Sequence, residues 1–211
     1  MRSVDQSLNP PMADKAQRII AAARDAFLEK GYDGVSMDEV ANRACVAKQT
    51  VYARYASKDA LFLAVVDSVQ GRVLSALSAA GPLPIRDRLR QIARGFLDLI
   101  LDPSILSLFR IALGASYRFP KLGHSIYGAR LKEAHGVLAE VIERAGKEGS
   151  LLVDNPAVAA EQFLALTRGE LYLHGLYDPS FRPSRTQITR QIDAALDCFM
   201  ARYGAEERSS M

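Results

Sequence analysis

The sequence has no tryptophan, only three histidines and only two cysteines in 211 residues. Cys45 and Cys198 stand far apart, which excludes a disulfide framework and a cysteine-rich metal site and is typical of a reducing compartment. The first 15 residues contain Asp5 and two prolines but no apolar core, so we expect no signal peptide. No uninterrupted apolar run reaches the roughly 18 residues of a membrane span. The sequence therefore predicts a cytoplasmic protein with no membrane partner.

The excess of positive over negative charge is also small, because the formal net charge is only +3. Any surface that binds nucleic acid must therefore be a local basic patch, and the charge alone is equally typical of a soluble protein. No histidine, cysteine or carboxylate spacing suits a metal, and no Ser-His-Asp or paired-carboxylate arrangement is present. We expect no cofactor, no metal and no catalytic residue.

Apolar residues recur at intervals of three and four, and no segment shows the alternation of a strand. The break Gly81-Pro82-Leu83-Pro84 separates two predicted domains, 14–80 and 81–211, and residues 1–13 are expected to form a flexible arm. The prediction is an all-α fold of about nine helices, over 14–30, 37–44, 48–55, 57–79, 85–101, 104–114, 120–148, 155–177 and 184–203.

The second and third of these helices are short, follow a longer one and are separated by a tight turn, which is the arrangement of a helix-turn-helix. Between Arg43 and Lys58 the chain carries four basic residues and no acidic one. A solvated helical hairpin would show the same charges, so the pattern alone leaves both interpretations open. A helical module that binds another protein through this face, and an enzyme built on a helical bundle, are the alternatives from other functional classes.

The stretch AFLEKGYDGVSMDEVANRACVAKQTVYARYASKDALFLAV resembles the N-terminal DNA-binding domain of the tetracycline-repressor (TetR) family, and the resemblance covers residues 16–66. It includes the turn Gly31-Tyr32, a capping box from Ser36 to Glu39, the TVY of the third helix and the start of the fourth helix at Ser57. The segment GPLPIRDRLRQIARGFLDLIL resembles the AefR-type branch. The resemblance implies a homodimeric regulator, with a C-terminal bundle for effector binding and dimerisation. It implies a repressor released from palindromic operator DNA by a small molecule, although the sequence leaves activation open.

The resemblance also assigns roles to single residues. Gln49 and Arg54 would read base edges, and Lys58 and the Ser36 end of the second helix would hold phosphates. Val51 and Tyr55, four residues apart on the opposite face of the third helix, are expected in the core, as are Phe27, Val40, Val46 and Leu61. The predicted DNA contacts are Ser36, Lys48, Gln49, Thr50, Tyr52, Arg54 and Lys58.

Two residues of the turn depart from the family pattern. Cys45 stands where the family usually has glycine, because the turn tends to need a positive φ, and Ala47 replaces the serine that usually caps the third helix. Either neighbouring packing compensates for these changes, or Cys45 acts as an oxidant sensor.

In the second domain, aromatic and histidine side chains are candidates for an effector pocket, although each is also compatible with ordinary core or surface. They are Phe96, Phe109, Tyr117, His124, Tyr127, His135, Tyr172 and His174. The many apolar residues indicate an apolar or aromatic effector. The last two helices are predicted to pair across a two-fold axis. The interface would contain Ile188, Ile192, Leu196 and Phe199.

Overall fold

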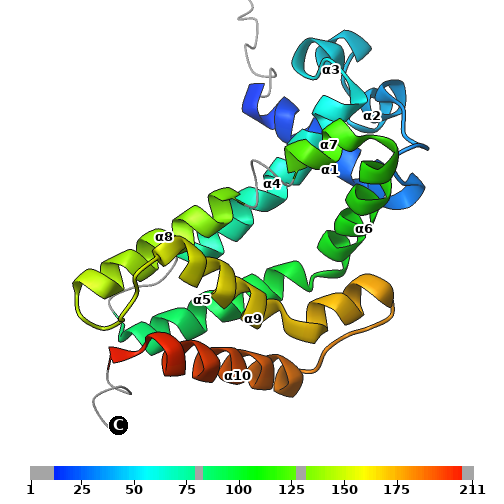
Figure 1. Cartoon of the computed structure of the whole chain (residues 1–211). Helices are drawn as coiled ribbons and strands as arrows, with labels where there is room; N and C mark the ends of the chain where they lie inside the picture. The colour runs from blue at the N-terminus through cyan, green and yellow to red at the C-terminus, as the bar shows by residue number, and fades with distance from the viewer. Residues whose placement is uncertain (1–11, 79–82, 127–131, 206–211) are drawn as a thin grey trace, which may run out of the picture. The chain divides into compact units, whose positions relative to one another are not determined.

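The computed structural model describes residues 12–78, 83–126 and 132–205 (Figure 1). The chain separates by its contacts into two compact units, Met1–Val66 and Asp67–Met211. Helix α4, Lys58–Ser78, begins in the first unit and continues into the second. The domain boundary at residue 81 stays a prediction, and most of the expected N-terminal arm lies outside the described residues.

The first unit contains α1 (Met12–Lys30), α2 (Met37–Arg43), α3 (Lys48–Arg54) and the start of α4. Its core is built around three aromatic rings. Phe27 and Tyr32 each meet Phe62 edge to face, at centroid distances of 4.9 and 5.3 Å. Burial of each such ring stabilises the fold by about 1.5–3 kcal/mol. These contacts connect α1 and the following turn to the first turns of α4.

The ends of these helices follow the sequence prediction. Gly31, with φ of 69°, ends α1, and its N–H donates to the carbonyl of Phe27. The Ser36 hydroxyl accepts from the N–H of Glu39 and caps α2, and Ser57 caps α4 in the same way through Ala60. The predicted capping box forms only by half, because the Glu39 carboxylate pairs with Lys30 and Arg43 instead.

The second unit contains the rest of α4 and six further helices. They are α5 (Ile85–Ile100), α6 (Pro103–Arg118), α7 (Pro120–Ser125), α8 (Lys132–Lys147), α9 (Pro156–Tyr177) and α10 (Arg185–Tyr203). Helix α9 packs against α8, α10, α5 and α6, and Figure 1 shows α10 running alongside α5 and α9. The core includes Leu97, Leu138, Phe163 and Leu196, all at most 3% exposed within the described chain. Outside the helices, the described residues show only an isolated bridge between Leu151 and Gly204.

The described residues form ten helices rather than nine. The helix predicted over 120–148 corresponds to α7 and α8, which lie on either side of residues 127–131, outside the described part. Helix α6 begins one residue earlier than predicted, because Asp102 caps it and Pro103 occupies its first position. It also ends four residues later, at Arg118.

Helix α9 is not continuous, which the sequence analysis did not anticipate. Gly169 takes φ 48° and ψ −153°, outside the helical region. The break is filled from α10, because the side-chain amide of Gln191 donates to the carbonyl of Leu166 at 2.7 Å. The positive φ favours glycine at position 169, and a Cβ there would lie 2.3–2.5 Å from the amide of Gln191, which would have to move.

The prediction for the apolar stripe of α10 needs a correction. Its four residues already pack in the unit's own core, with exposures of only 8, 3, 0 and 1% for Ile188, Ile192, Leu196 and Phe199. Phe199 meets Phe163 of α9 at a centroid distance of 5.1 Å. Periodicity identifies an apolar face but not its partner, and here the partner is the unit's own core.

Among the residues that the structure describes, one helix is long and apolar enough to span a membrane by length and composition alone, Lys58–Leu77, with a mean hydropathy of 1.5. Asp67 and Arg72 interrupt its apolar sequence. A quarter of the apolar window is buried in the structure, and Leu61, Phe62, Val65 and Leu77 are fully buried.

Candidate DNA-binding site

The turn between α2 and α3 is a Schellman turn, the usual end of a helix that closes on glycine. The N–H of Val46 donates to the carbonyl of Ala41, and the N–H of Cys45 donates to that of Asn42. Cys45 has a φ of 52° and is the one non-glycine residue with positive φ in the described ranges. The predicted positive φ is therefore confirmed, with a residue that adopts it at a cost.

Arg18 of α1 secures this turn, and sequence reasoning missed it. Its Nη2 donates to the carbonyls of Ala44 and Cys45 at 2.8 and 2.9 Å, and its Nε donates to the Ala44 carbonyl at 3.2 Å. Nothing in the spacing connects α1 to a turn 26 residues later. The sequence shows only that Arg18 is basic and lies on a helix that precedes the motif.

Helix α3 divides into a buried and an exposed face. Val51 is fully buried, and Tyr55 directly after the helix is half-buried. On the other side Gln49 and Arg54 are exposed, Tyr52 is 44% exposed and Thr50 is partly exposed. The helix begins without a side-chain cap at Ala47, as predicted. Its exposed face therefore presents amide, hydroxyl, phenol and guanidinium groups, the types that bond to bases and phosphates.

Two of the predicted cations already have contacts within the unit. The ammonium of Lys48 lies 2.7 Å from the Asp38 carboxylate and 5.6 Å from the centre of the Tyr52 ring. The hydrogen bond that its ammonium donates to the Asp38 carboxylate raises the pKa of Lys48 above its ordinary value. Lys48 therefore stays charged at neutral pH. Its charge is partly balanced by Asp38, an acidic residue of α2 that lies outside the segment 43–58.

Lys58 lies at the first position of α4. Its ammonium lies 4.8 Å from the centre of the Tyr32 ring and donates to the carbonyl of Asp33 at 3.3 Å. The phenol of Tyr32 in turn donates to the Asp59 carboxylate. Burial, reinforced by that carboxylate, raises the pKa of Tyr32 well above its ordinary value. The lysine is thus oriented by a neutral ring and a carbonyl, both of which leave its full charge available to an anion.

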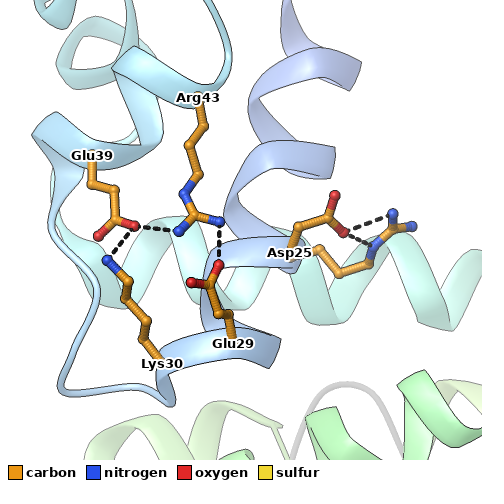
Figure 2. Close-up of polar contacts among 6 residues, drawn as sticks. Asp25, Glu29, Lys30, Glu39 and Arg43 are labelled. Carbon is orange, nitrogen blue, oxygen red and sulfur yellow. Dashed lines mark hydrogen bonds and ion pairs between the residues drawn. The ribbon is translucent and has the colours of Figure 1, made fainter.

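Arg43, the first basic residue of the segment 43–58, forms ion pairs within the first unit (Figure 2). Its guanidinium binds Glu29 of α1 at 2.7 Å and Glu39 at 2.6 Å, and Lys30 binds the same Glu39 oxygen at 2.8 Å. The hydrogen bond from Lys30 and those from Arg43 lower the pKa of Glu39. This network connects α1 to α2, so Arg43 supports the motif and is no candidate for a DNA contact.

The structure brings together only some of the effector candidates. Phe109 and Tyr172 meet edge to face at 6.0 Å, Phe96 is buried, and His135 is half-buried beside Glu161. Tyr127 lies outside the described residues. The other three candidates are at the surface, with Tyr117 90% exposed, His124 exposed, and His174 exposed and stacked on Phe181.

Two family models match the chain. The model of the bacterial regulatory proteins of the tetR family matches residues 19–65. The model of the AefR-like transcriptional repressor C-terminal domain matches residues 87–205, more than half of the chain. The first match covers the turn, α2 and α3 described above.

Relatives of known sequence and structure agree with the family models. The transcriptional activator FasR of Mycolicibacterium smegmatis is 35% identical over 94 residues, which cover 43% of this chain and 42% of FasR, so the match spans less than half of that relative. A TetR-family regulator from Mesorhizobium loti has a similar solved structure, with a TM-score of 0.83 and 29% identity over 93% of this chain and 100% of that one. The flavonoid-responsive regulator FrrA is 32% identical, with a TM-score of 0.69 over 91% and 98% of the two chains.

These regulators bind DNA through the helix-turn-helix and are not enzymes, which removes the alternative of a bundle enzyme. The matched residues, the capped helices and the Schellman turn lead to one assignment: the chain belongs to the TetR family of helix-turn-helix transcriptional regulators and carries an AefR-like C-terminal domain.

Proposed function

We propose that the chain represses transcription in the cytoplasm by binding a palindromic operator through α3 and Lys58. The exposed face of α3 carries the proposal, because Gln49, Tyr52 and Arg54 point away from the core beside Val51. Gln49 and Arg54 suit adenine and guanine edges in the major groove, and Thr50, Tyr52 and Lys48 suit the groove walls. Lys58 and the Ser36 end of α2 would bind phosphates on either side.

Selection of duplexes from a random-sequence library with the full chain tests this proposal. The expected product is an inverted repeat with half-sites about one helical turn apart, bound more weakly as salt increases. A module that binds protein through the same face would enrich no sequence and show little dependence on salt. Placing the selected duplex upstream of a reporter gene then distinguishes a repressor from an activator, as FasR is named.

An effector site in the second unit is the next part of the proposal. Thr167 of α9 is fully buried, and its hydroxyl has no hydrogen-bond partner within the described ranges. An unpaired buried hydroxyl costs free energy that a ligand could recover by bonding to it. Five residues further along α9, Tyr172 meets Phe109, and burial raises the pKa of Tyr172. An aromatic ligand with a polar substituent fits this set, and FrrA is named for its response to flavonoids, which are of that class.

Thr167→Val separates the effector site from the fold. The variant removes the unpaired hydroxyl at nearly constant volume, so we expect the free energy of unfolding to rise by about 1 kcal/mol. Binding of flavonoids, measured by calorimetry as the probe of the aromatic class, should weaken if the hydroxyl bonds to the ligand. Unchanged flavonoid binding in the variant would remove Thr167 from the site, and no binding by the wild type would exclude the flavonoid class.

Regulators of this family act as dimers, and we propose that this chain pairs through the outer faces of α9 and α10. A groove of about 620 Å³ runs between these helices, and its lining includes Ala165, Leu166 and Cys198. Val158, two turns before Ala165, is 42% exposed, and Leu173, beyond the break at Gly169, is 53% exposed. Two copies packed across a two-fold axis would bury these side chains in a four-helix interface, which replaces the one first predicted from α10.

Release of DNA by the effector completes the proposal. Helix α4 starts at Lys58 in the first unit and ends at Ser78 in the second, so it belongs to both. A ligand shifts the DNA-binding equilibrium only by its different affinity for the two arrangements of that helix. Effector and operator should therefore weaken each other's binding reciprocally, by about 1–3 kcal/mol. Equal ligand affinities with and without saturating operator would contradict this part.

A further inference from the structure

The end of α2 is held from outside by a cation of α1. The carbonyls of Ala44 and Cys45 lie beyond the last backbone hydrogen bonds of the Schellman turn, where a helix leaves its acceptors open. Arg18 donates three hydrogen bonds to these two oxygens, at 2.8 to 3.2 Å. A guanidinium also suits the negative end of the helix dipole.

Arg18 binds a turn whose backbone conformation is unfavourable for the residues that form it. Cys45 has a φ of 52°, where a side chain with a Cβ is disfavoured. Ala47, directly before α3, supplies no side-chain cap, so the first N–H groups of α3 gain nothing from it. The turn therefore lacks a glycine at its positive φ, and the start of α3 lacks a side-chain cap. The hydrogen bonds from Arg18 are made to this same part of the chain.

We propose that Arg18 is a positioning residue for sequence readout: by binding the carbonyls of Ala44 and Cys45 it holds the turn in its left-handed conformation and thereby fixes the orientation of α3. The inference rests on the proposed DNA-binding function. Arg18 contacts no base in this account and acts only through the turn. Arg43, two residues before this turn, cannot replace it, because Glu29 and Glu39 occupy its guanidinium.

Arg18→Met tests the inference, because methionine keeps an unbranched apolar stem and removes all three hydrogen bonds. We expect affinity for the selected duplex to fall about tenfold, as charge-assisted hydrogen bonds to the turn are lost. Affinity for a scrambled duplex should fall far less, and the dependence on salt should stay the same, since no phosphate contact is removed. Arg18→Lys should lie between the two, because an ammonium lacks the planar fork that reaches both oxygens.

Arg24→Met is the matched control, because it removes the same charge from the same helix. Arg24 is exposed, and its guanidinium pairs with the carboxylate of the adjacent Asp25 at 3.0 Å. The control should bind both duplexes like the wild type. Circular dichroism and thermal unfolding establish that each variant is folded at the temperature of the binding assay. If Arg18→Met does not fold, Arg18→Lys carries the comparison.

Cys45→Gly supplies the readout that a merely structural role would not change. Glycine adopts positive φ freely, so the turn should no longer depend on Arg18 for its conformation. In the Cys45→Gly background we expect Arg18→Met to lose about threefold or less, against about tenfold in the wild-type background. Amide hydrogen exchange over residues 46–50 should accelerate in Arg18→Met and return towards the wild-type rate in the double variant.

Three results would overturn the inference. First, Arg18→Met could bind both duplexes like Arg24→Met. Second, it could lose affinity equally on both duplexes with a smaller salt slope, which identifies a phosphate contact. Third, its loss of affinity could persist undiminished in the Cys45→Gly background. Absence of salt-dependent DNA binding by the wild type would instead contradict the proposed function itself, so the two failures are distinct.

Discussion

The ammonium of Lys48, at the first position of α3, lies 2.7 Å from the carboxylate of Asp38 in the first turn of α2. Both side chains are more than half exposed, so the pair faces solvent at the surface that we propose for DNA. A phosphate approaching Lys48 must compete with this carboxylate.

Asp38→Asn should therefore strengthen binding to every duplex. The change releases Lys48 and removes a negative charge beside the phosphates, so affinity should rise by up to about fivefold on operator and random DNA alike at low salt. Asp25→Asn, the same charge change on α1 at an exposed site, is the control and should alter affinity much less. Weaker binding by Asp38→Asn would mean that the pair positions α3 for binding.

Gln49 and Arg54 are the side chains that we expect to read bases. Replacing either with alanine should cost about 1–3 kcal/mol on operator and relax the preference at one base pair in each half-site. Both are exposed, so stability should hardly change. Binding to a library of single-base operator variants gives the result. A uniform loss over all sequences would show that the residue contacts phosphate instead.

Leu166→Glu and Phe199→Glu compare an exposed and a buried residue of the groove between α9 and α10. Leu166 is 37% exposed in the groove, so the glutamate should leave the monomer's stability within about 0.5 kcal/mol and abolish dimers. Phe199 is 1% exposed in the core, so the same charge there should destabilise the fold by about 4 kcal/mol. Analytical ultracentrifugation and urea unfolding measure the two effects. A dimeric Leu166→Glu variant would move the interface to another surface.

His135 predicts part of the dependence of stability on pH. Burial lowers its pKa below the ordinary 6.5, helped by Arg168 and opposed by Glu161, whose carboxylate lies 3.8 Å away. The unfolded chain therefore binds this proton more readily than the folded chain does. The neutral His135 side chain therefore contributes to the stability of the fold above pH 6.5. This stability is lost as the pH falls through the lower pKa of His135 in the folded chain. His135→Gln should make urea midpoints less sensitive to pH as the pH falls below about 6.5. An unchanged slope would show that His135 is not responsible.

Much of the fold could be predicted because its signals are local. The caps at Ser57 and Asn155, the stop at Gly31 and the positive φ at Cys45 all depend on a few neighbouring residues. The faces of α3 follow from helical spacing around Val51.

The missed features depend on residues distant in sequence. The break of α9 at Gly169 is occupied by Gln191 of α10, 22 residues further along, and a lone glycine is common within continuous helices. Arg18 reaches a turn 26 residues away. The stripe of α10 containing Phe199 was correctly apolar, but spacing cannot say whether its partner is the chain's own core or a second copy.

The salt dependence of duplex binding by the wild type and by Lys58→Ala tests the central claim most directly. Lys58 is expected to hold a phosphate, so its loss should weaken selected and scrambled duplexes similarly and reduce the magnitude of the salt slope by about one to two units for a dimer. The wild type should prefer the selected inverted repeat by about 10³-fold or more and show a steep slope. Binding without sequence preference and with a flat salt response, identical in wild type and variant, would contradict a DNA-binding role for α3 and Lys58.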